Sequence, residues 1–299
     1  MNPLTQFKKI PILPLLLALA LVVVAAAGAA RAAISDFNGD GHPDYVLSNA
    51  STRQTAIWYL NNNVFISGAP GPTLPAGWAL VAIADFDGDG HPDYVLENDN
   101  TGQTAGQTAI WYLSGPTLIR GAYGPTLPSG WYLVAIADFN GDGHPDYLLA
   151  NGSTRQTAIW YLNNNVFVSG APGPTLPAGW ALVAIADFNG DGHPDYVLEK
   201  GSTGQTVIWY LSGPTLIRGA YGPTLPSGWG LAAIADFNGD GHPDYVLEAA
   251  STRQAAIWYL NNNVFVRGAY GPAPPAPAAW TLFEVIVGLG PATGKWDYP

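Results

Sequence analysis

A unit of about 50 residues is written five times along this chain, and this repetition restricts the fold more than any other feature. The string Asp-Phe-(Asn/Asp)-Gly-Asp-Gly-His-Pro-Asp-Tyr begins at Asp36, Asp85, Asp138, Asp187 and Asp236, with spacings of 49, 53, 49 and 49 residues. A period of this length is typical of propellers, solenoids and arrays, in which each repeat is one supersecondary block. The fold is therefore expected to be a repetition of one small block.

Each unit contains four short apolar runs separated by turn residues. In the second unit they are Leu80–Phe86, Tyr94–Glu97, Thr108–Leu113 and Thr117–Arg120, with the acidic string between the first two. The runs are rich in Ile, Val, Trp and Tyr and are bounded by Gly, Pro, Asn and Asp, which is typical of β-strands. Four strands per unit, stacked face to face around an axis, make a β-propeller. We therefore expect an all-β fold, a propeller of five four-stranded blades.

The units are of two kinds, which we call A and B. Units one, three and five (A) carry Trp-Tyr-Leu-Asn-Asn-Asn-Val-Phe, starting at Trp58, Trp160 and Trp258. Units two and four (B) carry Trp-Tyr-Leu-Ser-Gly-Pro-Thr-Leu-Ile-Arg, starting at Trp111 and Trp209. The order A-B-A-B-A suggests amplification of a two-unit segment.

The two ends of the repeat region complement each other. The repeats begin near residues 33, 80, 133, 182 and 231, and only three residues of unit one, 33–35, precede its acidic string. Segment 280–287 aligns with the strand that begins at Trp78, so it is expected to supply the missing strand and close a ring over 33–287, with 288–299 as a tail. Closure would remove an exposed sheet edge. The alternative is an open array that closes only by pairing with other copies.

The N-terminal segment resembles an export signal. Lys8 and Lys9 precede an apolar stretch over 10–27, and Ala30-Arg31-Ala32 fits a cleavage site, so residues 1–32 are predicted to be a signal peptide. A permanent membrane anchor is the alternative. Cleavage removes three of the 11 basic residues and no acid, which leaves a net charge of 8 − 22 = −14. We expect an exported protein, secreted or at the cell surface, with the periplasm as the other location, and with no membrane span after cleavage.

The acidic string carries the strongest chemical signal, a predicted calcium site in each repeat. Oxygen-bearing side chains occupy positions 1, 3, 5 and 9, and Gly occupies position 6, where the chain turns sharply. Calcium binds six to eight oxygens from carboxylates, amides, carbonyls and water. The predicted ligands, with His contributing its backbone carbonyl, are Asp36, Asn38, Asp40, His42 and Asp44; Asp85, Asp87, Asp89, His91 and Asp93; Asp138, Asn140, Asp142, His144 and Asp146; Asp187, Asn189, Asp191, His193 and Asp195; and Asp236, Asn238, Asp240, His242 and Asp244.

A simpler interpretation is that Asp-Gly and Asn-Gly only make tight hairpins. Against it, the five strings hold 16 of the 22 acidic residues. Bare carboxylates packed this closely repel one another, and a bound cation would remove that cost. We therefore predict up to five Ca²⁺ ions, one per repeat.

The five Asp-x-(Asn/Asp)-x-Asp-Gly-x-x-Asp strings, each followed by Tyr-(Val/Leu)-Leu, resemble the FG-GAP/VCBS repeats of integrin α-subunits and of many secreted bacterial proteins. The resemblance covers nearly all of the chain after residue 32. It implies a β-propeller with calcium between the first two strands of each blade. Integrin-type propellers have seven blades, whereas this chain has five units.

Other features of the sequence exclude several classes of function. The chain has no Cys, which excludes disulfides and thiol chemistry, and no basic run that would indicate nucleic-acid binding. Near-identical repeats offer no unique catalytic constellation, and the histidines lack a partner nucleophile or base, so we expect no enzyme. A second tryptophan series, after the Pro-(Ala/Ser)-Gly turns, could stack on sugars but is expected to pack in the core: Trp78, Trp131, Trp180, Trp229 and Trp280.

The function expected from the sequence is that of a calcium-binding scaffold for adhesion or protein interaction. The alternatives are a multivalent lectin, in which near-identical pockets bind glycans with avidity, and a self-assembling extracellular structural protein. The partner is a protein or a glycan in the first two cases and another copy of the chain in the third.

Overall fold

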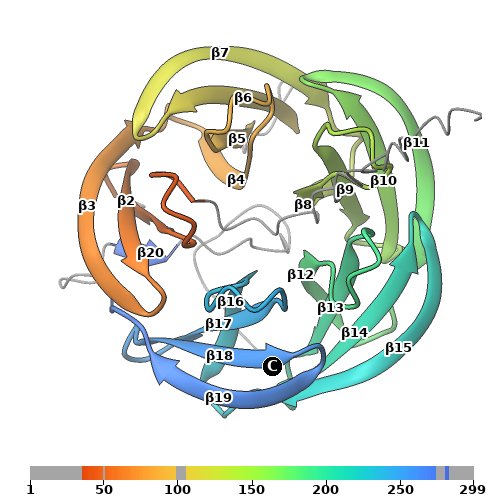
Figure 1. The fold of residues 1–299 in the computed structure, drawn as a ribbon. Coiled ribbons are helices and arrows are strands. Elements are labelled where there is room, and N and C mark those ends of the chain that lie inside the picture. Colours follow the sequence, from red (N-terminus) through yellow and green to blue (C-terminus); the bar gives the residue numbers. More distant parts are fainter. Residues whose placement is uncertain (1–35, 50, 99–105, 274–279, 283–299) are drawn as a thin grey trace, which may run out of the picture.

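The structure is a computed structural model that describes residues 36–49, 51–98, 106–273 and 280–282. The described part contains no helix and forms five four-stranded antiparallel sheets arranged as blades around an axis (Figure 1). The fold expected from the sequence is therefore confirmed. The predicted signal peptide, the start of unit one, and residues 283–299 lie outside the described residues.

Each blade runs from an innermost strand to a long outer strand on the rim (Figure 1). The strands are β1 (Tyr45–Asn49), β2 (Gln54–Asn61), β3 (Val64–Thr73), β4 (Trp78–Ala84), β5 (Asp93–Asn98), β6 (Gln107–Ser114), β7 (Thr117–Thr126), β8 (Trp131–Ala137), β9 (Asp146–Asn151), β10 (Gln156–Asn163), β11 (Val166–Thr175), β12 (Ala181–Ala186), β13 (Asp195–Lys200), β14 (Gln205–Ser212), β15 (Thr215–Thr224), β16 (Trp229–Ala235), β17 (Asp244–Ala249), β18 (Ala255–Asn261), β19 (Val264–Tyr270) and β20 (Trp280–Leu282). Blade one is β20-β1-β2-β3, and blades two to five follow in chain order.

The fourth strand of each of the first four blades is longer than its apolar run suggested. In blade two, β7 continues past Arg120 through Gly121-Ala122-Tyr123 to Thr126, and it stays paired with β6. Gly121 is needed there because a Cβ would lie 3.1 Å from Cδ1 of Trp111 on the neighbouring strand. The turn-like composition of this stretch therefore reflects close packing within the sheet.

The hydrophobic core lies between the blades. Each of five clusters of buried residues joins two neighbouring blades; the cluster between blades two and three, for example, combines Val95 and Ile110 with Leu133 and Tyr147. Both faces of a blade are covered, which explains why the third strands are apolar on both faces. Five tryptophans lie in the third strands of the blades and five follow the Pro-(Ala/Ser)-Gly turns or their variant. All ten are half-buried and pack against these clusters, as expected for residues of the blade core.

The ring closes through β20. Leu282, Thr281 and Trp280 pair with Leu47, Ser48 and Asn49 of β1, in the same way that β4 pairs with β5. The C-terminal segment therefore supplies the innermost strand of blade one, as the sequence predicts.

Contacts between neighbouring blades at the rim explain why the chain has two kinds of unit, A and B. Three hydrogen bonds connect the third Asn of an A hairpin to the carbonyl of the Tyr in the outer strand of the preceding blade: Asn165 to Tyr123, Asn263 to Tyr221 and Asn63 to Tyr270, at 2.9–3.0 Å. The last of these joins blade five to blade one. It exists because unit five is a hybrid, with an A hairpin but the Arg-Gly-Ala-Tyr outer strand of a B unit, a feature that the sequence analysis missed.

A second bond between blades lies within the core. In blades two to five, the Tyr that ends the acidic string donates its hydroxyl hydrogen to a buried Thr of the preceding blade. The pairs are Tyr94 to Thr55, Tyr147 to Thr108, Tyr196 to Thr157 and Tyr245 to Thr206, at 3.2–3.5 Å. At the closing junction, blade five has Ala255 in place of this Thr. The buried hydroxyl of Tyr45 has no hydrogen-bond partner among the described residues.

Restoring this bond should stabilise the ring. In an Ala255→Thr variant, the new hydroxyl would face Tyr45, and we expect a gain of about 0.5–1.5 kcal/mol in the free energy of unfolding, the usual net value of one hydrogen bond. Urea unfolding of the variant and the parent protein measures the gain. The control adds Tyr45→Phe to both proteins, and the gain should then disappear. A gain that survives when Tyr45→Phe is present would mean that the added methyl group, and not the hydrogen bond, stabilises the junction.

Candidate metal centre

The five acidic loops connect the innermost strand of each blade to the second strand. In blade two the loop spans 85–92, between β4 and β5. Two glycines at positions 4 and 6 have positive φ, 74° at Gly88 and 87° at Gly90, and the four other loops repeat these values closely. The left-handed conformation favours Gly, so the expectation of a sharp turn at position 6 is confirmed and extends to position 4.

Backbone N–H groups satisfy the first and fifth side chains of the loop. Asp85 accepts hydrogen bonds from the N–H of Gly88 at 2.8 Å and of Gly90 at 2.9 Å, and Asp89 accepts one from the N–H of His91 at 2.8 Å. The same contacts recur in the other loops. The carboxylates are therefore not bare, and the repulsion assumed from their spacing is partly offset by the backbone that folds around them.

Position 3 differs between the loops. In four of them it is Asn, whose amide donates to the position-5 Asp at 2.9–3.0 Å. In the second loop it is Asp87, which pairs with Arg120 of β7 at 2.9 Å. The guanidinium of Arg120 also lies over the ring of Tyr112, 3.4 Å from its centroid. Each loop thus has a hydrogen-bond donor next to its carboxylates. It is the position-3 amide of the loop itself in four loops and the guanidinium of Arg120, from β7, in the second.

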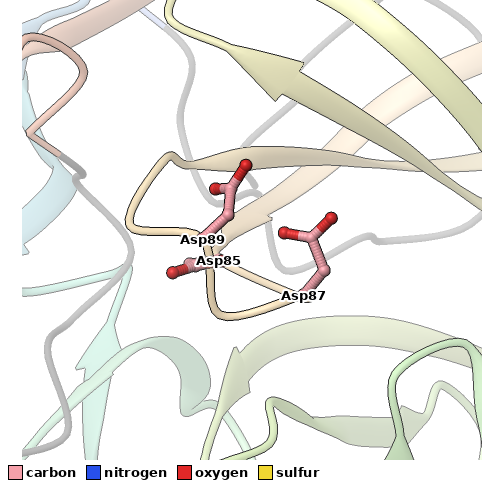
Figure 2. Close-up of side chains that lie close together, drawn as sticks. All are labelled: Asp85, Asp87 and Asp89. Carbon is pink, nitrogen blue, oxygen red and sulfur yellow. The ribbon is translucent and has the colours of Figure 1, made fainter.

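The second loop gathers three carboxylates in an arrangement that could hold a cation. Ligand oxygens of Asp85, Asp87 and Asp89 lie within 4.8 Å of one another, and the three side chains project from a single loop (Figure 2). Asp93 is not part of this group. In the described residues no other group of three acidic, His or Cys side chains meets the same distance.

The position-9 carboxylate points into the protein. Asp93 is fully buried and accepts hydrogen bonds from the N–H of Phe86, at position 2, and of Leu113, on β6, both at 2.9 Å. It thus continues the pairing of β5 with β6 beyond the Tyr94–Trp111 pair. Asp44, Asp146, Asp195 and Asp244 make the same pair of contacts. These residues, predicted as metal ligands, connect the loop to the third strand of the blade.

Burial raises the pKa of these five carboxyl groups. Desolvation is the largest cause, opposed by the two backbone N–H donors, and the pKa rises to about 6 for Asp44 and to about 7 for Asp93, Asp146, Asp195 and Asp244. The neighbouring loop carboxylates raise it further. A nearby cation would act in the opposite direction and favour the charged form.

The histidines lie where the sequence places them, at position 7 of each loop, half-buried in four loops and exposed at His91. Their backbone N–H groups help to close the loop, and their carbonyls remain the atoms predicted to bind calcium. Arg120 is the functional neighbour that the sequence analysis overlooked. The sequence offered two indications of this contact. Unit two alone has Asp at position 3, and the same unit has an Arg in its outer strand.

Comparisons with known proteins agree with this geometry. The sequence model of the FG-GAP-like repeat matches residues 36–96 and 138–198. These segments cover the first two and the next two acidic loops with the strands around them. The chain therefore contains FG-GAP-like repeats in these two segments, and to that extent the resemblance drawn from the sequence is confirmed. No match was found among curated proteins.

Similar solved structures are distant in sequence. A chain of the Tc holotoxin pore from Photorhabdus luminescens is 17% identical with a TM-score of 0.45, and the match covers 83% of this chain and 12% of that one. A protein of unknown function from Bacteroides caccae is 14% identical with a TM-score of 0.41, covering 76% and 73%. The β-propeller domain of Cps50 (Swd1) from Myceliophteria thermophila is 13% identical with a TM-score of 0.37, covering 81% and 87%.

The structural role of the position-9 carboxylate can be separated from metal binding. An Asp93→Asn variant would place an amide donor against the N–H of Phe86 or Leu113, and we expect it to lose about 1–3 kcal/mol of stability. The measurement is urea unfolding at pH 8 with a chelator present. The control, Asp87→Asn, reproduces the Asn of the four other loops and removes only an exposed ion pair, so it should cost less than about 1 kcal/mol. If Asp93→Asn unfolds like the parent protein without metal, the carboxylate has no structural role.

Proposed function

We propose that this protein is an exported, calcium-stabilised β-propeller that acts as an adhesion or protein-interaction scaffold. The observation that carries the proposal is the chemistry of the rim. All large hydrophobic side chains that are exposed in the described residues belong to the outer strands β3, β7, β11, β15 and β19, which surround the ring in Figure 1. Contiguous apolar surface of this kind marks interaction sites.

The rim is apolar on both faces of its strands. In β3, the consecutive residues Val64, Phe65 and Ile66 are 55%, 44% and 61% exposed, and β11 and β19 repeat this pattern. In β7 and β15 two consecutive aliphatic residues and a tyrosine are exposed. An outer strand also has one edge that no strand of its blade covers. Extended segments of a partner protein can pair with such an edge, while apolar side chains add contact area. The rim therefore offers five similar places for a protein partner.

Calcium is proposed as the stabilising ion of the loops. The loop oxygens are hard ligands suited to it, and a cation would displace the donor that now faces them, the position-3 amide in four loops and Arg120 in the second. Export is proposed from the N-terminal 32 residues. Within the described residues there is no helix long and apolar enough to cross a membrane. A binding role is proposed in place of catalysis because nearly every polar residue of the loops is repeated from blade to blade.

Calcium should raise the melting temperature of chelator-treated protein. One site at a hundred times its Kd adds about 2.7 kcal/mol, which corresponds to roughly 5–10 °C for a domain of this size. Differential scanning calorimetry with Ca²⁺ or Mg²⁺ provides the measurement, and Mg²⁺ should have the smaller effect. The control variant carries Asn at position 5 of all loops, in place of Asp40, Asp89, Asp142, Asp191 and Asp240. An equal rise in this variant, or no rise in the parent, would exclude the loops as calcium sites.

The rim should be the contact surface for cells. A five-site variant replaces one exposed aliphatic residue per outer strand with Thr, which keeps the β-branched shape: Ile66→Thr, Ile119→Thr, Val168→Thr, Ile217→Thr and Val266→Thr. We expect the labelled variant to bind cells of the producing organism at least tenfold less than the parent protein, with an unchanged melting temperature. Sedimentation velocity separates binding to a partner from self-association. Equal binding of both proteins would show that the contact lies elsewhere.

A further inference from the structure

An open groove on blade three is lined by aromatic side chains, of which two lie inside the blade and one, Phe167, belongs to the rim. It has a volume of about 360 Å³, at the lower end of the range for small-molecule sites. Its aromatic lining residues are Trp131 of β8, Trp160 of β10 and Phe167 of β11. The rest of the lining comes from β10 and β11 and includes Gln156 and Pro172.

The aromatic rings are held in place by the strands. Trp160 lies against Gly170, where a Cβ would come within 2.9 Å of its Cδ1, so the indole rests on the backbone of β11. Phe167 meets this indole with a centroid separation of 4.8 Å and an angle of 60° between the rings. Trp160 and Trp131 also pack against the core shared with blade two. The groove therefore has rigid aromatic surfaces that need no rearrangement to accept a ligand.

The B units have a tyrosine at the corresponding strand position. Pro172 pairs with Ala158, and at the equivalent position in blade two Tyr123 pairs with Ala109. The Tyr123 ring packs on Trp78, the counterpart of Trp131, with centroids 6.2 Å apart and 30° between the planes. Tyr221 and Tyr270 occupy this position in blades four and five. Only units one and three carry Pro here, at Pro70 and Pro172.

The chemistry of the lining selects a neutral ligand with one apolar face. No lining residue carries a charge, although the protein as a whole is strongly acidic. Among the described residues, the side-chain amide of Gln156 has no hydrogen-bond partner, whereas Gln254 in blade five donates to the carbonyls of Ala255 and Gly271. A sugar ring fits this combination, since its C–H face can stack on an indole while its hydroxyls face the amide and water.

We propose that the groove of blade three, formed by Trp131, Trp160, Phe167 and Pro172, binds uncharged hexoses, and that the equivalent residues of blade one, Trp280, Trp58, Phe65 and Pro70, form a second site. In blade one, Trp58 and Phe65 have nearly the same geometry as their counterparts, with centroids 4.9 Å apart and 65° between the rings. Two such sites on one rigid ring would give avidity for a glycan that presents several such sugars. This inference goes beyond the proposed scaffold role; it does not require calcium, and of the apolar rim it uses only Phe65 and Phe167.

The test exchanges the residues that distinguish the A and B outer strands. Saturation-transfer NMR of the purified protein uses the methyl β-glycosides of glucose, galactose and N-acetylglucosamine, with decaproline as a peptide that also binds aromatic grooves. A Pro70→Tyr/Pro172→Tyr variant should lose saturation transfer to the sugar, because the tyrosines would pack on Trp280 and Trp131 as Tyr123 packs on Trp78 and so cover the indole surfaces. A Tyr123→Pro variant should gain a third groove and increase the transfer. Both substitutions already occur at the same strand position elsewhere in the chain, and melting temperatures verify the fold.

Several results would overturn the proposal. One is the absence of transfer to any of the three sugars with the parent protein. Another is transfer that persists unchanged in the double Tyr variant while its melting temperature matches that of the parent. Binding of decaproline without any sugar would assign the groove to a proline-rich peptide. Loss of sugar binding in the double Tyr variant together with a gain in Tyr123→Pro is the result we expect.

Discussion

Burial of apolar side chains between neighbouring blades is the interaction on which the rest of the structure depends. A single blade covers neither of its faces, so the five clusters exist only when the blades stand in a ring. The Tyr–Thr hydrogen bonds lie in the same layer and fix how one blade sits on the next. Because the core is shared in this way, the loops and the rim are displayed at regular intervals by a rigid support.

The acidic loops belong to this support as well as to the surface. The buried carboxylate at position 9 connects each loop to the third strand of its blade, as Asp93 does through Phe86 and Leu113. The carboxylates at positions 1 and 5, joined by Asp87 at position 3 of the second loop, remain available above it. A cation bound there would therefore act on a loop that is already anchored in the blade, so metal binding would add to the stability of a preformed site.

Much of this architecture could be predicted from the sequence, because a fivefold repeat exposes the pattern five times. The strand order, the number of blades, the loop positions and the closing strand at Trp280 all followed from it. The burial of Asp93 could not be predicted, because spacing treats every loop oxygen alike and only the fold separates those that face inward. The unpaired hydroxyl of Tyr45 was equally hidden. Ala255 occupies the position that is Thr in the other blades, and the effect of this difference is evident only once the contact between blades is known.

The hybrid unit five determines which ring sizes this sequence can form. A strictly alternating ring closes on matched junctions only with an even number of blades, whereas five blades bring an A outer strand against an A hairpin. Tyr270 removes that mismatch by giving blade five the outer strand of a B unit, so that Asn63 finds its usual acceptor. Insertion of another A-B pair would leave every A hairpin next to a B-type outer strand and enlarge the ring to seven, whereas gain of a single A unit would place an A outer strand against an A hairpin. The rim thus restricts which units can be added, and growth of the gene by pairs is compatible with closure.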